Sequence, residues 1–455
     1  MKKIKAVCVL LAAVIFAGCG AADPDPPADS RSTSDTVGTE GEQTTTATEA
    51  VSESETDTEP VSTVPEVIED PQPEYVEWML EEKVHEIRIE IDEQEWQAIK
   101  NNPYNGDYHP ANVSIDGERV ENVGLRTRGH ASLEYAIEKG TKYPFKIKFD
   151  KYVDDQTFMG LDELALNNGG DDFAFIRDYI CYEAFQILDG YTSCVTYFNV
   201  YLNDELKGFY VGIEAIDKSY LERHFGSHKH NLYEGENGAT LETFMSLSCF
   251  TQKKGSDTSM EDIQRLIEVL DETPTGEKGD IESCIDVDSV LKMFAVNAVL
   301  DNRDGYCGIY AHNYYFYNAD GRLVMLPWDM NAPSMSAYTD IASPTIDVFD
   351  ASSVNSRPLA KKLLAVEEYY ARYLDYCGRL TDWLPELKEQ VERIYEMIKP
   401  CVEADGNIFS SLYWFNYQYS LDNTKGVMYL LTYRYDYLTS RLEELIGASE
   451  DAPAA

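Results

Sequence analysis

Three side chains in the second half of the sequence have the chemistry to hold a divalent metal ion. Asp304 lies in a polar loop after an apolar helical stretch, Asn313 precedes an expected strand at 314–317, and Asp329 follows an expected strand at 323–326. If the turn of this hairpin centres near position 320, Asn313 and Asp329 come to the same end of it. Two carboxylates and an amide oxygen suit Mg²⁺ or Mn²⁺. Such residues also serve as turn and capping residues, but the convergence of three separate elements favours a site.

A site that handles phosphate also needs cations, and the first half of the sequence offers several on or beside expected strands. Lys146 and Lys148 share one face of a strand at 145–149, opposite its apolar face, and Lys142 lies just before that strand. Arg128 ends the preceding strand, and an arginine there can pair with phosphate or with a surface carboxylate. A solvated strand edge is an equally good interpretation of any single lysine. The residue types alone do not select among them.

The elements that must position these residues change in character along the chain. Alternating apolar residues predict strands in the first part, interrupted by one long helix, whereas the second part is mostly helical with one inserted hairpin. This order predicts an α+β protein with the two-lobed plan of an atypical protein kinase, a β-rich N-lobe followed by an α-rich C-lobe. The expected strands are 84–91, 113–115, 120–125, 145–149, 195–202 and 206–213, and the expected helices are 172–188, 219–225, 287–300, 357–380, 384–402 and 427–446.

Seven short segments, taken in order, resemble the successive motifs of the spore-coat CotH kinase family. No single segment is specific, but the ordered set is. The segments are GLRTRG at 124–129, FKIKFD at 145–150, FMGL at 158–161, GFYVGIE at 208–214, NRD at 302–304, NYY at 313–315 and PWD at 327–329.

The resemblance implies a role for each residue of the candidate metal site. Asp304 would be the catalytic carboxylate, which orients the acceptor hydroxyl and takes its proton. Asn313 would hold one metal ion, and Asp329 would bridge that ion to the phosphates of ATP. Phosphoryl transfer depends on such positioning and charge neutralisation more than on covalent chemistry.

The resemblance also selects among the cations and suggests a hinge residue. Lys146 takes the place of the phosphate-binding lysine, and Lys148 and Lys142 remain possible in its stead. Arg128 is a further candidate nucleotide contact, suggested by its strand position rather than by the resemblance. A helical carboxylate, Glu183 or Asp178, could pair with the lysine. Glu214 ends the last strand of the first lobe, where a kinase hinge would lie, and a structural role and a nucleotide contact are equally compatible with it.

The sequence also departs from ordinary protein kinases in three respects. It has no Gly-rich G-x-G-x-x-G loop and no His-Arg-Asp triplet, and the gap from Asp304 to Asn313 exceeds the usual spacing. His312 is adjacent to Asn313, and a lone histidine beside a strand start is expected to be structural.

The N-terminus has the features of a bacterial lipoprotein. A basic start and a short apolar run predict a signal peptide at 1–19 that ends in a lipobox-like segment, with Cys19 as the lipidated residue and Phe16 as a departure from the usual pattern. Residues 20–74 are rich in Ser, Thr, Pro and acids and predict a disordered tether. We therefore expect the N-lobe at 75–217, the C-lobe at 218–448 and a tail at 449–455, held on the extracellular face of the cell membrane.

The composition limits the partners. The formal net charge of −43 argues against binding to nucleic acid, and scattered cysteines without a C-x-x-C pair argue against zinc. The first hypothesis is therefore an ATP- and Mg²⁺-dependent kinase acting on Ser or Thr of an exported protein. The alternative is a catalytically inactive, kinase-shaped adhesion or assembly module, which the scarcity of ATP outside the cell would favour.

Overall fold

The computed structural model describes residues 72–140, 142–170, 172–331, 357–405 and 412–450. The predicted signal peptide, Cys19 and nearly all of the predicted tether lie outside the described residues, as does most of the tail. From Pro73 onward the chain belongs to one compact unit. The predicted division into an N-lobe and a C-lobe at 217/218 stays a prediction.

The strands of the first part form a closed barrel, whereas the sequence predicted only a β-rich lobe. In β1, Ile87, Ile89 and Ile91 alternate onto the buried face as predicted. Pairing of β1 with β6 is parallel and closes the barrel, whereas its other pairs are antiparallel. Around the barrel the order is β1 (Val84–Ile91), β2 (His109–Ile115), β3 (Glu118–Thr127), β4 (Phe145–Lys148), β5 (Glu163–Asn167), β7 (Glu205–Glu214) and β6 (Val195–Leu202).

Helices pack around this barrel, and one of them begins later than predicted. The predicted helix at 172–188 is α4 (Arg177–Ile187). Its start is delayed because the Asp172 carboxylate accepts hydrogen bonds from the backbone N–H groups of Ala174, Ile176 and Arg177, at 2.9, 2.7 and 2.8 Å, and so holds a turn ahead of the helix. The other helices of this region are α1 (Glu74–Met79), α2 (Glu93–Asn101) and α3 (Ala131–Lys139).

The predicted hairpin is present, but it belongs to a larger sheet. Tyr314 pairs with Pro327 and Ala319 with Arg322, which is the register expected for a turn near position 320. The sheet runs in the order β11 (Arg322–Pro327), β10 (Tyr314–Ala319), β8 (Leu232–Gly235) and β9 (Phe250–Lys254). β8 and β9 were not predicted from the sequence.

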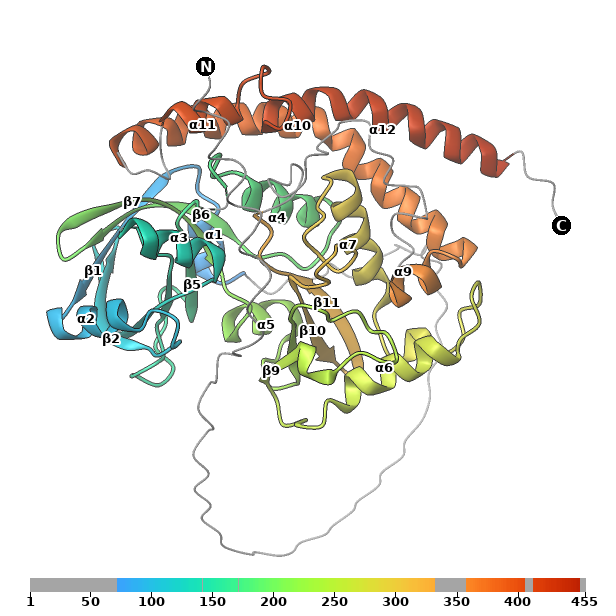
Figure 1. Cartoon of the computed structure of the whole chain (residues 1–455), viewed down its shortest axis with the longest axis horizontal. Coiled ribbons are helices and arrows are strands. Elements are labelled where there is room, and N and C mark those ends of the chain that lie inside the picture. Colours follow the sequence, from blue (N-terminus) through green and yellow to red (C-terminus); the bar gives the residue numbers. More distant parts are fainter. Residues whose placement is uncertain (1–71, 141, 171, 332–356, 406–411, 451–455) are drawn as a thin grey trace, which may run out of the picture. The chain divides into compact units, whose positions relative to one another are not determined.

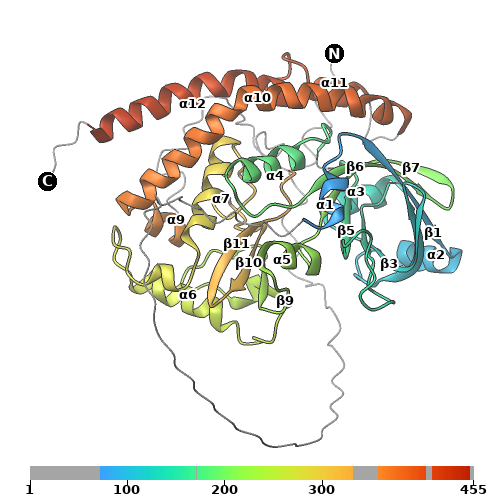
Figure 2. The ribbon, with the colours of Figure 1, turned by 180° about the vertical axis from the view of Figure 1, so that it is seen from behind.

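The rest of the described chain is helical (Figures 1 and 2). The predicted helices at 357–380 and 384–402 are instead the short α9 (Pro358–Leu363) and the 39-residue α10 (Glu367–Asp405), which bends and contains Pro385 and Pro400. α10 packs against α7, α12 and β7. The remaining helices are α5 (Lys218–Phe225), α6 (Glu261–Glu272), α7 (Val287–Val299), α11 (Leu412–Gln418) and α12 (Val427–Glu450), with 3₁₀ turns at Leu247–Cys249 and Ile281–Ser283.

Two hydrophobic cores organise these elements. One fills the barrel, and the other includes the outer faces of α4 and β7 together with α7 and α10. Because the second core extends from the barrel wall into the helical part, the two-lobed plan is met only in part. No helix of the described residues has the length and apolar character to cross a membrane. All seven cysteines in the described part of the chain are unpaired.

Candidate active site

The loop that carries Asp304 is fixed from two directions. Arg434 of α12, which is 3% exposed, donates from Nε to the carbonyl of Val299 at 2.5 Å and from Nη2 to that of Ala298 at 2.7 Å. It thereby satisfies the last carbonyls of α7, which a helix end leaves without partners. The amide oxygen of Asn302 then accepts the backbone N–H of Asp304 at 3.0 Å. The start of the loop is therefore held rigidly at the end of α7.

The Asp304 carboxylate is held by two neighbours from the start of the hairpin. His312 Nε2 lies 2.7 Å from Oδ1, and Asn313 Nδ2 lies 3.2 Å from Oδ2 and 2.8 Å from the Asp304 carbonyl oxygen. Because an ionised carboxylate only accepts hydrogen bonds, we assign the proton to His312 Nε2. Apart from its position next to Asn313, nothing in the sequence indicated that His312 would lie at the site.

Asn313 and Asp329 lie at the same end of the hairpin, as its register requires. The Tyr314–Pro327 pair is the last of the ladder, so Asn313 directly precedes it and Asp329 follows two residues after it. Both have a left-handed backbone, with φ of 61° and 51°. Non-glycine residues in this region are strained and are found preferentially at functional sites. This end of the hairpin therefore brings together the three side chains predicted from the sequence.

Three carboxyl groups, those of Asp304, Asp329 and Asp178, act on one another near this end of the hairpin. Partial burial raises the pKa of Asp329, Arg128 opposes the change, and the nearby Asp304 adds to it. Asp178 of α4 is 3% exposed, and burial followed by the charge of Asp329 raises its pKa to about 8. A divalent cation would relieve this repulsion.

The donor set at this end of the hairpin suits Mg²⁺ or Mn²⁺ only in part. Asn313 uses its amide nitrogen on Asp304, so its amide oxygen could serve as a metal ligand together with the Asp329 carboxylate at the same end of the hairpin. The described residues contain no group of three His, Cys, Asp or Glu side chains arranged for a metal ion. The pattern fits an ion that takes one or two protein oxygens and completes its shell with phosphate and water.

The barrel contributes two cations to the same place. Arg128 Nη2 lies 3.7 Å from Asp329 Oδ1, and its guanidinium lies 5.4 Å from the centre of the Trp328 ring. Lys146 Nζ lies 5.9 Å from the same ring. Trp328 is 8% exposed and packs edge-on against Tyr315 of β10. The tryptophan beside Asp329 is thus a rigid surface over which both cations lie.

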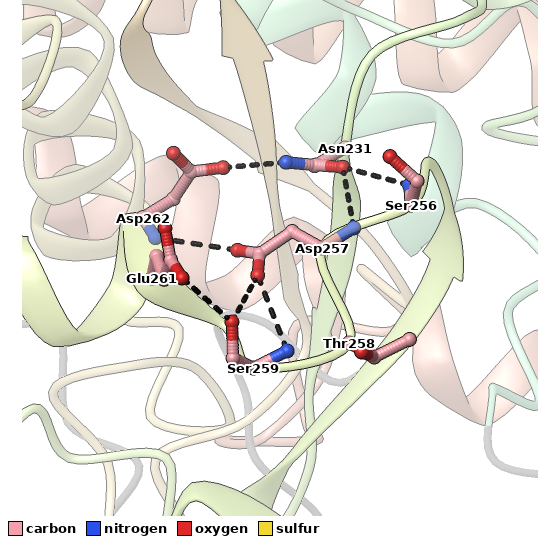
Figure 3. A pocket seen from close by; sticks show the side chains of 7 residues that line it. All are labelled: Asn231, Ser256, Asp257, Thr258, Ser259, Glu261 and Asp262. Carbon is pink, nitrogen blue, oxygen red and sulfur yellow. Dashed lines mark hydrogen bonds between the residues drawn. The ribbon is translucent and has the colours of Figure 1, made fainter.

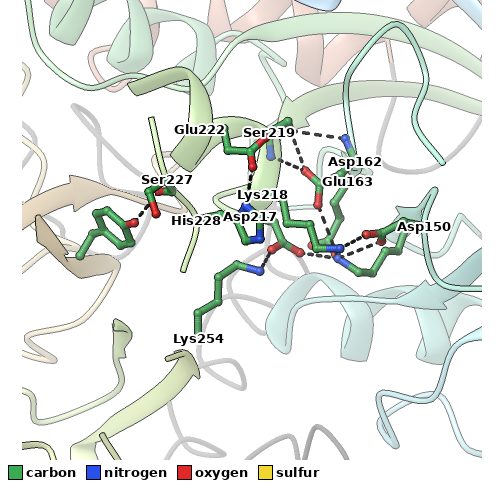
Figure 4. A network of polar contacts seen from close by, with 12 residues as sticks. Asp150, Asp162, Glu163, Asp217, Lys218, Ser219, Glu222, Ser227, His228 and Lys254 are labelled. Atoms are coloured by element: carbon green, nitrogen blue, oxygen red, sulfur yellow. Dashed lines mark hydrogen bonds and ion pairs between the residues drawn. The ribbon is translucent and has the colours of Figure 1, made fainter. Parts of the chain in front are cut away.

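The other two lysines have different surroundings. The Lys148 ammonium is within an ion-pair network, 3.3 Å from Glu163, 3.4 Å from Asp150 and 3.6 Å from Asp162, and it also contacts Asp217; Figure 4 shows these four carboxylates. Lys142 is 2% exposed and pairs with Asp405 of α10 at 2.6 Å.

Of the three lysines, Lys146 is therefore the one beside Trp328, the residue that precedes Asp329. Its ammonium pairs with Glu163 Oε1 at 2.5 Å, and burial lowers its pKa. The lysine's partner thus comes from strand β5. Glu183 and Asp178 of α4, the two partners considered from the sequence, do not fill this role, and Asp178 instead accepts from Asn167 Nδ2 at 2.9 Å.

Glu214 is a structural residue in this fold. It is fully buried, and its oxygens accept from the Tyr75 hydroxyl at 2.5 Å, the Cys194 backbone N–H at 2.9 Å and Arg223 Nη2 at 2.5 Å. With no exposed surface it has no access to a nucleotide. We therefore remove it from the candidate nucleotide contacts, because its position at the end of β7 is explained by the ion pair with α5.

Two hollows elsewhere on the surface do not include these residues. One, of about 330 Å³, lies at the start of α6, where Asn231, Asp257 and Asp262 bond to one another or to their neighbours (Figure 3). The other, of about 250 Å³, is lined by aromatic and polar residues that include Tyr191, Phe225 and Arg322. Neither changes the assignment of the site.

The site combines several features of a kinase-like protein. These are an aspartate on a loop, an asparagine and an aspartate on the following hairpin, and basic side chains from a β-rich part. A family model described as CotH kinase protein matches residues 125–438. The chain belongs to the CotH kinase protein family. A comparison with curated proteins found no match.

Two solved structures show weak similarity to the chain. One is the Helicobacter pylori proinflammatory kinase CtkA, with 14% identity and a TM-score of 0.27, covering 66% of this chain and 94% of that one. The other is a complex of the Shewanella oneidensis MR-1 toxin–antitoxin proteins HipA and HipB with operator DNA, with 12% identity and a TM-score of 0.24, covering 63% of this chain and 58% of that one.

Proposed function

We propose that this chain is a protein kinase that transfers the γ-phosphoryl group of ATP to Ser or Thr of an exported protein, with Mg²⁺ or Mn²⁺. It would act on the extracellular face of the cell membrane, held there by a lipid on Cys19. Membership of the CotH kinase family supports kinase-type chemistry. The acceptor, the metal, the nucleotide and the location are our inferences.

The observation that carries the proposal is that potential metal ligands from one part of the chain lie close to basic side chains from a distant part. Asp304, Asn313 and Asp329 converge at one end of the β10–β11 hairpin. Arg128 and Lys146 reach that end from the barrel, over Trp328. A polyphosphate and a divalent cation need this combination of oxygen ligands and cations, whereas a binding module has no need of all of it.

Each residue has one task in the reaction. Asp304 accepts the hydrogen bond of the acceptor hydroxyl and takes its proton as the oxygen bonds to the γ-phosphorus and the bond to the ADP oxygen breaks. Lys146 and Arg128 would hold the phosphate oxygens, and Asp329 and Asn313 would hold the metal. The metal, when bound, neutralises charge on the β- and γ-phosphates.

The two aspartates therefore predict different defects. Asp329→Asn should weaken Mg²⁺–ATP binding about tenfold or more, because its carboxylate binds the nucleotide through the ion. Asp304→Asn should leave binding nearly intact and lower transfer by about 10²- to 10⁴-fold. Lys146→Ala should weaken nucleotide binding but retain metal affinity. Binding is measured by calorimetry on the full chain, and transfer with radiolabelled ATP and casein.

Measurements of nucleotide binding and transfer by the parent protein distinguish the proposal from its alternative. Transfer of label that depends on Asp304 supports a kinase. Failure of the parent to bind Mg²⁺–ATP would overturn the proposal and favour an inactive adhesion or assembly module. Binding without transfer to any acceptor would overturn the catalytic part and favour a nucleotide-dependent scaffold.

A further inference from the structure

The segment between Asp304 and Asn313 is longer than in ordinary kinases, and the structure fixes it at several points. The backbone N–H of Gly238 donates to the Tyr310 carbonyl at 2.7 Å, and the buried Tyr306 hydroxyl donates to the Thr240 carbonyl at 3.0 Å. Arg357 Nη2 donates to the Gly308 carbonyl at 2.7 Å. These bonds tie the segment to neighbouring loops, so its last residues have a defined position.

His312 occupies a special position at the end of this segment. The residues on both sides of it, Ala311 and Asn313, have left-handed backbones with φ of 50° and 61°. Ala311 is fully buried, and the His312 ring packs edge-on against Tyr310 with centroids 5.5 Å apart. Strained backbone conformations persist only where the surrounding structure enforces them. The position of the His312 side chain is therefore set by its surroundings.

His312 is directed by this backbone onto Asp304. Its Nε2 lies 2.7 Å from Oδ1, while Asn313 Nδ2 lies 3.2 Å from Oδ2, so each carboxylate oxygen has one donor. Two donors on the two oxygens fix the rotation of the carboxylate about its last bond. Each oxygen keeps a further lone pair, and an incoming hydroxyl can be accepted only along those directions.

We propose that His312 is a positioning residue that holds the Asp304 carboxylate in the orientation required by the acceptor hydroxyl. This inference rests on the proposed phosphotransferase function. It assigns to His312 a part mainly in the turnover step, because its hydrogen bond goes to Asp304, whereas among the described residues its effect on Asp329 is electrostatic and involves no hydrogen bond. Transfer is sensitive to misplacement of a reacting group by a fraction of an ångström.

Three variants separate the hydrogen bond from the packing of the ring. His312→Ala removes both, His312→Phe keeps the ring beside Tyr310 without a donor, and His312→Gln offers an amide N–H near the place of Nε2. We expect kcat to fall about tenfold or more in the Ala and Phe variants and to recover largely in Gln, with KM for ATP and nucleotide binding unchanged. His109→Ala is the matched control, because His109 makes a similar 2.7 Å contact with Glu95 within the barrel region; its kcat should equal that of the parent.

A second readout does not depend on activity. In the ligand-free full chain, nitrogen-detected NMR of the His312 ring should show a proton on Nε2, and Asp304→Ala should change that signal. Equal kcat in Phe and parent, or a Gln variant no better than Phe, would overturn the positioning role even if the protein is a kinase. Absence of transfer by the parent would instead contradict the proposed function, and the NMR experiment would then still decide whether the hydrogen bond exists.

Discussion

Asp178 offers a test of the electrostatics at the candidate site that needs no substrate. One oxygen of this buried carboxyl accepts from Asn167, whereas the other is buried without a hydrogen-bond partner in the described structure. Burial, and then the charge of Asp329, raises its pKa from 3.8 to about 8. The folded protein therefore keeps a proton on Asp178 at pH values where the unfolded chain has lost it.

The sign of the effect on stability follows from this difference. A carboxyl group whose pKa is higher in the folded state does not lower the free energy of unfolding at pH values below its pKa in the unfolded chain. For Asp178, stability is then lost as the pH rises from about 4 to about 8. Since one pKa unit corresponds to about 1.4 kcal/mol, the loss is about 6 kcal/mol at most. Asp178→Asn, which mimics the protonated acid, should remove this loss.

The measurement compares unfolding free energies from urea titrations of the parent and variant at pH 5, 7 and 9. At pH 5 the Asn variant should be more stable by about 1 to 2 kcal/mol, and at pH 9 by about 5 to 6 kcal/mol. Asp92→Asn is the control, because its carboxylate accepts one backbone N–H at the start of α2, at 2.7 Å, and Asp92 is not among the groups that shift the pKa of Asp178. A constant difference between Asp178→Asn and parent across this range would refute the reasoning.

Two further predictions concern the buried ion pair of α10 and the lipid anchor. Lys142→Met removes the cation from a buried pair with Asp405 and should lower the free energy of unfolding by about 3 to 5 kcal/mol, measured in urea; a loss below about 1 kcal/mol would contradict this. The double variant with Asp405→Leu should lose less than the sum of the single variants. Cys19→Ser should move the protein from the membrane fraction to the soluble fraction, and a parent without lipid by mass spectrometry would show the anchor to be wrong.

Residues that depend on local pattern were well predicted from the sequence. The hairpin register followed from one turn, and it places Asn313 and Asp329 together as expected. The alternation in β1 likewise gave its buried face. In both cases the information lies within about a dozen neighbouring residues, where side-chain periodicity is set by backbone geometry.

Features that depend on distant pairing could not be predicted in the same way. β5 is buried throughout and does not alternate, so Glu163 gave no sign that it would pair with Lys146. The short strand β8 becomes regular because it pairs with β10, from a much later part of the chain. α10 continues through Pro385 because its buried face, which includes Leu384 and Leu387, remains packed across the proline. In each case tertiary packing overrides local preference.

Arg434 makes the candidate site depend on a helix that lies far from Asp304 in the sequence. This one side chain of α12 holds the carbonyls at the end of α7, from which the Asp304 loop begins. A chain in which α12 has not docked therefore lacks the partner that orders the start of this loop. The loop and α12 should become ordered together during folding, so the site is completed only when this helix is in place.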